Sequence, residues 1–314
     1  MKGLVIKSTG SSYIVRMDDG TDAECRIKGN FRIRGIRSTN PVAVGDFVDV
    51  EDGWITDIHP RRNYIIRRST NLSKESHILA SNIDQVALIV TINHPATSTT
   101  FIDRYLATCE AYRVPVVLIF NKIDLLTPEE LETLAELRTL YESLGYQTLA
   151  ISAKNLNSEP IHRMLSGKTT LLSGNSGVGK STLLNALFGR EMTRTGVISD
   201  AHDKGMHTTT FSEMYFLEEI INHQSSISTI NAGALIDTPG IKGFGTIDFE
   251  REEVSHYFRE IFRIGRECRF SNCTHTGEPG CAVQEAVIKG SITLSRYESY
   301  LSMLDDIKEG KYRA

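Results

Sequence analysis

Short runs of alternating apolar and polar residues dominate the first 68 positions of the chain. They occupy residues 4–6, 13–15, 23–27, 47–50 and 54–58, separated by turn sequences such as Asp18-Asp19-Gly20. Five short strands at this spacing predict a small closed barrel. An OB-fold, a barrel that commonly binds nucleic acid, is the leading interpretation. An SH3-like barrel with a structural role is the alternative.

A different pattern begins at about residue 69. Continuous apolar runs at 86–90, 116–120, 148–152, 169–172 and 234–236 alternate with helical patterns at 101–112, 128–144 and 181–188. This alternation predicts a mostly parallel, doubly wound sheet. Beyond residue 250 the pattern is mostly helical, apart from a cysteine-rich loop. We therefore expect a multidomain α/β protein divided at 1–68, 69–249 and 250–314.

Composition and charge exclude some classes of protein. The chain has 314 residues, of which 40% are hydrophobic and 24% charged, which is typical of globular proteins rather than disordered chains. Apolar runs are far shorter than the ~18 residues of a membrane helix, so we expect a cytoplasmic protein without a membrane partner. The first 68 residues carry 12 Lys and Arg against 9 Asp and Glu, whereas the whole chain has a net charge of -4. A basic cluster in that segment is either a nucleic-acid contact or a solvated loop: Arg26, Lys28, Arg32, Arg34 and Arg37.

A glycine-rich loop between an expected strand and an expected helix matches the pattern G-x-x-x-x-G-K-[ST]. In such a loop, backbone N–H groups face phosphate oxygens and the following helix N-terminus adds positive potential. Lys180 is expected to reach the β- and γ-phosphates, and Ser181 to bind Mg²⁺. The expected phosphate contacts are Gly174, Asn175, Ser176, Gly177, Val178, Gly179, Lys180, Ser181 and Thr182.

Two further motifs follow expected strands and suit a purine base. Asn121, Lys122, Ile123 and Asp124 form an N-K-x-D motif. The Asp124 carboxylate can accept two hydrogen bonds from guanine, for which adenine has no matching donor pair, while Asn121 can bond the purine edge and tie the loop. The Lys122 stem can cover the ring. A later strand ends in a loop that resembles the guanine-carbonyl contact of GTPases: Ser152, Ala153 and Lys154.

The sequence Asp237-Thr238-Pro239-Gly240 follows the 234–236 strand. Asp237 can hold Mg²⁺ through water, and the Gly240 N–H can meet the γ-phosphate. Upstream, Thr208 and Thr209 are candidates for the catalytic switch, and Thr209 for completing the Mg²⁺ shell, although this threonine run also fits an ordinary strand.

Ile241 occupies the position where many small GTPases carry a water-orienting Gln. Isoleucine cannot orient water, so we expect slow intrinsic hydrolysis and a catalytic group from elsewhere. His207 is the local candidate, although a surface or packing histidine fits equally well.

These motifs resemble the five G motifs of a GTPase in a permuted order. The chain runs from N-K-x-D to S-A-K, then to the P-loop, the switch threonines and D-x-x-G. Permutation changes surface connections and keeps the sheet and the loops at its strand ends. We therefore expect a circularly permuted GTPase domain.

Three of the five cysteines lie within 14 residues, together with a histidine: Cys268, Cys273, His275 and Cys281. Four soft ligands suit one tetrahedral Zn²⁺ per chain, and a fully protein-coordinated ion is structural rather than catalytic. The alternative is a cluster of buried reduced thiols.

The whole chain resembles the ribosome small subunit-dependent GTPase A family of the RsgA/YjeQ type. The resemblance rests on the barrel with Val44-Gly45-Asp46, the permuted motif order, the 205–210 segment and the cysteine loop. It implies a monomeric GTP phosphohydrolase that binds GTP, GDP, the 30S subunit and 16S rRNA, and acts late in 30S maturation under stimulation by the 30S. It also implies that the barrel and the zinc domain contact rRNA. The family usually carries Arg where this chain has Met206, which leaves the role of that Arg open.

A second interpretation is a nucleotide-gated rRNA-binding module whose hydrolysis only resets binding. Both interpretations require GTP binding. They differ in whether 30S subunits raise turnover or whether nucleotide only changes RNA affinity.

Overall fold

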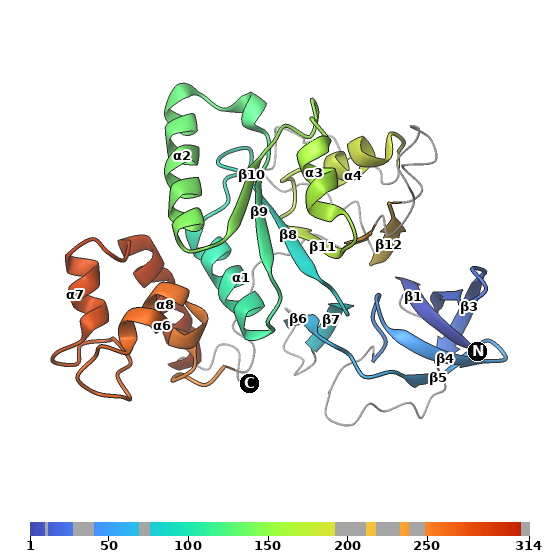
Figure 1. The fold of residues 1–314 in the computed structure, drawn as a ribbon, viewed down its shortest axis with the longest axis horizontal. Helices are drawn as coiled ribbons and strands as arrows, with labels where there is room; N and C mark the ends of the chain where they lie inside the picture. The colour runs from blue at the N-terminus through green and yellow to red at the C-terminus, as the bar shows by residue number, and fades with distance from the viewer. Residues whose placement is uncertain are drawn as a thin grey trace.

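The computed structural model describes residues 1–9, 12–27, 41–68, 76–191, 212–217, 233–238 and 249–308. A barrel and a set of C-terminal helices lie at opposite ends of the long axis, with a doubly wound sheet between them (Figure 1). In the described ranges, no helix is long and apolar enough to span a bilayer.

The first five strands close into a barrel. They are β1 (Lys2–Ser8), β2 (Tyr13–Met17), β3 (Asp22–Ile27), β4 (Phe47–Glu51) and β5 (Trp54–Ile58). Their order is β1-β2-β3-β5-β4, and β4 returns to pair with β1. This is the topology of an OB-fold, so the SH3-like alternative is wrong. Val5, Val15, Cys25, Val48 and Ile55 fill the interior because every second strand residue points inward.

A short antiparallel hairpin, β6 (Tyr64–Arg68) and β7 (Ser76–Ser81), connects the barrel to the next sheet. Asp46, at the start of β4, is fully buried and holds this connection together. Its carboxylate accepts hydrogen bonds from Arg61 at 2.7 and 2.6 Å and from Ser81 Oγ at 2.6 Å. Gly45 has φ +96, and a Cβ there would lie 2.1 Å from the Ser81 carbonyl oxygen. The Val44-Gly45-Asp46 sequence is thus the joint between the barrel and the rest of the chain.

The central sheet has the order β10-β9-β8-β11-β13-β12. Its strands are β8 (Gln85–Val90), β9 (Val116–Phe120), β10 (Gln147–Ala150), β11 (Thr169–Gly174), β12 (Glu213–Phe216) and β13 (Ala234–Asp237). All the pairings are parallel except that of β12 with β13. β12 also continues into the barrel through a single pair, Lys7 with Glu213.

Helices cover both faces of this sheet, as the doubly wound prediction requires. The helices are α1 (Thr99–Ala111), α2 (Pro128–Ser143), α3 (Glu159–Leu165) and α4 (Lys180–Phe188). In β8, Val86, Leu88 and Val90 pack into the core under α1 and α2, whereas Ala87 and Ile89 pack into the core under α3 and α4. Burial on both faces explains why the strands are continuously apolar rather than alternating.

The C-terminal unit contains η2 (Val254–Tyr257), α6 (Arg259–Gly265), α7 (Ala282–Ile288) and α8 (Leu294–Lys308). Its apolar core includes Ala107 of α1, so it packs directly on the central domain. Arg296 of α8 is 1% exposed and bridges Asp103 of α1 and Glu260 of α6, each at 2.7 Å. Tyr141 of α2 also donates to Asp103, at 2.9 Å. Removing one member of a buried, hydrogen-bonded charge cluster leaves an uncompensated charge, so we expect such a change to destabilise the packing of α8 on α1.

Candidate functional site: a phosphate-binding loop and a metal loop

The glycine-rich loop runs from the end of β11 into α4, and its glycines are required by close contacts. Gly174, Gly177 and Gly179 have φ values of +145, +83 and +99, which other residues rarely adopt. A Cβ on Gly174 would lie 2.3 Å from the Ile89 carbonyl oxygen. A Cβ on Gly179 would lie 2.3 Å from Asn121 Nδ2. The loop is therefore pressed against β8 on one side and against the N-K-x-D segment on the other.

Lys180, at the start of α4, is folded back over this loop. Its side chain is buried, and Nζ donates to the carbonyl oxygens of Gly174 at 2.7 Å and Asn175 at 2.8 Å. Burial lowers the pKa of Lys180 to about 8, an effect that the Asp237 carboxylate opposes. A cation held by two carbonyl oxygens in a desolvated position can exchange them for phosphate oxygens, which are stronger acceptors.

Asn121 ties the phosphate loop to the third motif. It follows β9, is 2% exposed, and donates from Nδ2 to the Val178 carbonyl oxygen at 2.8 Å. Its Oδ1 accepts from the Ala153 N–H at 3.0 Å. One amide N–H remains for a purine edge. The tying role anticipated for Asn121 is thus present, across separations of 57 and 32 residues.

Lys122 and Asp124 lie in a sharp turn after β9. Lys122 has φ +64, and its Nζ donates to the His94 carbonyl oxygen. Burial, and then the nearby Lys154, lower the pKa of Lys122. Asp124 follows in η1 (Ile123–Leu125) with its side chain exposed. Of the S-A-K motif, Ser152 and Ala153 are buried and Lys154 is exposed.

Only part of the expected Mg²⁺ site lies within the residues that the structure describes. Asp237 ends β13, 1% exposed, beside β11 in the sheet. Thr238 Oγ1 donates to the Leu172 carbonyl oxygen at 3.4 Å, which holds the end of β13 to β11. Met206, His207, Thr208, Thr209, Gly240 and Ile241 lie outside the described residues.

One wall of this site, the loop between β8 and α1, is not predicted by any sequence motif. Pro95 lies against the phosphate loop, 3.3 Å from where a Gly177 Cβ would be. Thr91 Oγ1 donates to the Pro95 carbonyl oxygen at 2.5 Å, and His94 accepts from Lys122. A loop of this length carries no sequence pattern that marks it as part of a site. Its role follows from the position of β8 between β9 and β11.

The four expected metal ligands converge. The ligand atoms of Cys268, Cys273, His275 and Cys281 all lie within 4.8 Å of one another. Cys268 Sγ lies 4.0 Å from Cys281 Sγ, and these two sulfurs lie 3.6 and 3.5 Å from His275 Nδ1. Ideal tetrahedral zinc would place such atoms about 3.5–3.8 Å apart, given bonds of ~2.3 Å to sulfur and ~2.0 Å to nitrogen. The residues therefore fit a tetrahedral metal ion.

Two tyrosine side chains of the last helix, α8, hold the backbone of the metal loop in place. Tyr297 donates to the His275 carbonyl oxygen at 2.5 Å, and Tyr300 to the Thr274 carbonyl oxygen at 2.6 Å. The Cys281 Sγ caps α7 by accepting from the Gln284 N–H at 3.5 Å. Burial raises the pKa of the Cys273 thiol to about 12, so a metal ion must displace protons when it binds.

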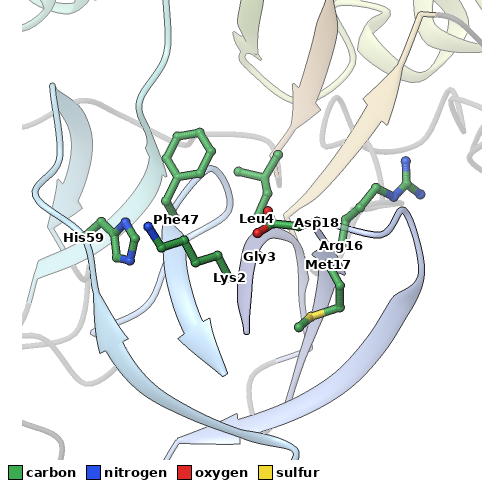
Figure 2. A pocket seen from close by; sticks show the side chains of 8 residues that line it. All are labelled: Lys2, Gly3, Leu4, Arg16, Met17, Asp18, Phe47 and His59. Atoms are coloured by element: carbon green, nitrogen blue, oxygen red, sulfur yellow. The ribbon is translucent and has the colours of Figure 1, made fainter. Parts of the chain in front are cut away.

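The barrel offers a weaker candidate for nucleic-acid contact. Its outer face carries a pocket of about 280 Å³ beside Phe47, which is 51% exposed; Figure 2 shows Lys2 and His59 near this ring. Two of the basic side chains lining the pocket already have a carboxylate partner, Arg16 with Asp22 at 2.8 Å and His59 with Asp49 at 3.2 Å. Of the predicted basic cluster, Arg26 is exposed on β3, and the other four residues lie outside the described part of the chain.

A permuted GTPase sheet, an N-terminal OB barrel and a Cys₃His loop define the class of protein: a circularly permuted GTPase with two accessory units. The chain belongs to the RsgA GTPase family. The family model described as RsgA GTPase matches residues 58–247, and the RsgA N-terminal domain matches residues 2–54. The chain is accordingly a GTP hydrolase.

Relatives and solved structures match over the full length. The chain is 57% identical to the "Small ribosomal subunit biogenesis GTPase RsgA" of Phocaeicola vulgatus, covering 100% of this chain and 99% of the relative. It is 56% identical to the protein of the same name from Porphyromonas gingivalis, with the same coverage. The structure of YjeQ from Thermotoga maritima is similar with a TM-score of 0.70 and 31% identity, over 97% of each chain. YloQ, "a circularly permuted GTPase", matches with a TM-score of 0.67 and 26% identity, over 98% of this chain and 95% of that one.

Proposed function

We propose that this GTPase binds the 30S ribosomal subunit and hydrolyses GTP to GDP and phosphate during late 30S maturation, stimulated by the 30S. One observation carries the proposal: the nucleotide site, the barrel and the metal loop occur together in a chain that is 57% identical over its full length to a small ribosomal subunit biogenesis GTPase. We place the RNA-binding barrel at 1–68, the GTPase domain at 69–249 and the zinc-binding domain at 250–314. We expect a cytoplasmic monomer.

In this proposal the guanine base is bound by Asp124, with Asn121, Lys122 and the 152–154 loop around it. The phosphates lie against residues 174–182. Lys180, buried and held by two carbonyl oxygens, would turn to the β- and γ-phosphates. Ser181, Asp237 and Thr209 would form the Mg²⁺ side, and the Gly240 N–H would meet the γ-phosphate. His207 and Thr208 are the local catalytic candidates.

We assign Zn²⁺ to the Cys₃His loop, at one ion per chain. Four protein ligand atoms within 4.8 Å of one another, three of them thiols, suit Zn²⁺ and leave no coordination position for a substrate. Zinc would therefore act by fixing the loop between α6 and α7. Chemistry on GTP belongs to the other site.

The experiment is co-sedimentation of the protein with 30S subunits in each nucleotide state. A switch ordered by the γ-phosphate and released on hydrolysis predicts tight 30S binding with a non-hydrolysable GTP analogue and weaker binding with GDP. Linkage requires the 30S to raise the affinity for the triphosphate by the same factor. Equal sedimentation in both states would contradict the proposal.

A further inference from the structure

The loop between β8 and α1 is closed on itself by hydrogen bonds between its two ends. The Thr91 N–H donates to Thr97 Oγ1 at 3.1 Å, and the Thr97 N–H donates to the Thr91 carbonyl oxygen at 2.9 Å. Thr91 Oγ1 also donates to the Pro95 carbonyl oxygen at 2.5 Å. Because these bonds pin both ends, the residues between them have few conformations open to them, and they lie where the loop meets the nucleotide site.

Asn93 uses both ends of its side-chain amide within this loop. Its Oδ1 accepts from the His94 N–H at 2.9 Å, and its Nδ2 donates to Glu130 Oε1 at 2.8 Å. His94 has φ +60, in the left-handed region, which is costly for a residue with a Cβ and persists only where neighbouring contacts enforce it. In this conformation the His94 carbonyl oxygen accepts from Lys122 Nζ. Asn93 thus helps to set the position of the carbonyl group that binds Lys122.

Glu130 carries the contact from Asn93 to the start of α2. Its Oε2 accepts from the Thr127 N–H at 3.0 Å, while Thr127 Oγ1 accepts from the Glu130 N–H at 3.3 Å, which forms the capping box of α2. The bond from the Thr127 backbone, and then that from Asn93, lower the pKa of Glu130. The carboxylate is therefore charged at neutral pH, and hydrogen bonds to a charged acceptor are the stronger kind.

The turn that contains Asp124 is held by this loop on both sides. Lys122, two residues before Asp124, is bound directly by the loop, and Thr127, three residues after it, is bound through Glu130. Asp124 itself is exposed, so its place depends on how its neighbours along the chain are held rather than on burial. Asn93 takes part in both contacts, although it lies outside the N-K-x-D motif.

We propose that Asn93 is a positioning residue for guanine recognition, and that its bond to Glu130 holds the Asp124 carboxylate where it can accept from both guanine N1–H and the 2-amino group. A pair of parallel hydrogen bonds to one carboxylate demands a defined geometry, so a small displacement weakens the pair. A purely structural role for Asn93 would instead lower the affinity for every purine nucleotide equally. The inference rests on the proposed function, in which Asp124 binds the base.

The test compares GDP with IDP, whose hypoxanthine base lacks the 2-amino group. Competition against a ribose-labelled fluorescent GDP, on the full-length protein with Mg²⁺, gives both affinities, and their ratio reports the hydrogen bond to that group. We expect the wild type to prefer GDP by about tenfold or more, the worth of one charge-assisted bond. Asn93→Asp keeps the acceptor for the His94 N–H but places a second carboxylate against Glu130. We expect this repulsion to reduce the preference at least about threefold.

A second variant tests the link itself. Asn93→Asp/Glu130→Gln reverses the polarity of the pair, because the new amide can donate to the new carboxylate while its oxygen still accepts from the Thr127 N–H. We expect this double variant to recover most of the preference for GDP. Asn63→Ala removes two hydrogen bonds to the backbone of Ile83, away from the nucleotide site, and is the control. It should keep the wild-type ratio even where its melting temperature falls.

The ratio in each protein decides the outcome. Equal losses of GDP and IDP affinity in Asn93→Asp, at an unchanged ratio, would overturn the proposal, because they would show a structural role alone. A double variant with native circular dichroism that stays as unselective as Asn93→Asp would also overturn it, since the link would not run through Glu130. Wild-type protein that binds GDP and IDP equally would contradict the proposed guanine site itself, so the wild-type ratio separates a failure of the proposed function from a failure of this inference.

Discussion

The nucleotide site and the metal loop are built in opposite ways. The nucleotide site gathers segments that lie far apart in the chain, and Asn121 alone connects residues 57 and 32 positions away. The metal site takes all four ligands from 268–281. Permutation leaves the first intact because the sheet, rather than the chain order, brings its parts together. The metal site depends on few contacts from the rest of the chain, beyond the two tyrosines of α8 whose hydroxyls donate to carbonyl oxygens of the metal loop.

We expect the largest effect from a variant that loses GTP turnover and keeps its fold. Lys180→Ala removes the cation folded over the phosphate loop, and we expect GTP turnover to fall at least ~100-fold, since interactions with transition-state charge are lost. Zinc content and circular dichroism should stay native. The measurement is phosphate release under saturating GTP. Native turnover with a native spectrum would show that the P-loop assignment is wrong.

Damage to the metal loop should remain local. We expect Cys273→Ala to lose the metal, about one zinc per chain by elemental analysis, and to loosen the residues from about 250 onward in hydrogen exchange. Affinity for guanine nucleotides should stay within about threefold, because distant sites that share no partner usually couple by about 0.5 kcal/mol or less.

Cys25→Ala is the matched control for the metal loop, since Cys25 is buried in the barrel away from the cluster. If elemental analysis finds no bound zinc in natively purified wild-type protein, the assignment of the metal is refuted.

The reciprocal change should damage the nucleotide site and spare the metal loop. Asn121→Ala leaves the Val178 carbonyl and the Ala153 N–H without their partner. Each unsatisfied buried group costs roughly 1–3 kcal/mol of stability. We expect weaker GTP binding by calorimetry with full zinc occupancy. Asn63→Ala, which also removes hydrogen bonds to one backbone carbonyl and one backbone N–H, both of Ile83, is the control. Loss of zinc in Asn121→Ala would break the contrast between the two sites.

Base selection should reside in one exposed carboxylate. Asp124→Asn is expected to weaken GTP binding by roughly 1.5–3 kcal/mol, the worth of a charge-assisted hydrogen bond. The variant should gain affinity for xanthosine triphosphate, because the amide can donate to the 2-oxo group. Competition binding with both nucleotides measures this exchange. Unchanged GTP affinity would place guanine recognition elsewhere.

The smallest expected effect is a proton uptake. Burial lowers the pKa of Lys180 to about 8, so above that pH the free protein holds the neutral amine. Phosphate oxygens favour the charged form, so GTP binding should take up as much as one proton above about pH 8 and weaken as pH rises. Calorimetry in buffers of different ionisation enthalpy measures it. Lys122→Gln controls for the second lysine whose pKa is lowered, and absence of uptake in that variant would exclude Lys180 as the source.

Local signals account for what the sequence predicted. The alternation of apolar and polar residues predicted β2, and the turn sequences around it predicted where the barrel strands end. The continuous apolar runs at 86–90 and 116–120 predicted the buried strands β8 and β9. The β6–β7 hairpin, α3 and the antiparallel β12 were not predicted, because they are short and carry weak periodicity.

Long-range polar contacts were beyond prediction for a different reason. Arg296 and Asp103 are 193 positions apart, and each reads as an ordinary surface charge on its own helix. Only the packing of α8 on α1 buries them together. The same holds for Arg61 and Asp46, whose pairing fixes the barrel joint.

The most direct test of the account is GTP hydrolysis by the full-length protein with and without purified 30S subunits, under multiple turnover. We expect slow intrinsic turnover, because Ile241 cannot orient water, and a rise of at least about tenfold with 30S subunits as the docked state supplies or orders the missing group. The Lys180→Ala variant should show no such rise. Equal turnover with and without 30S subunits, with only RNA affinity responding to nucleotide, would contradict it and leave a nucleotide-gated RNA-binding module.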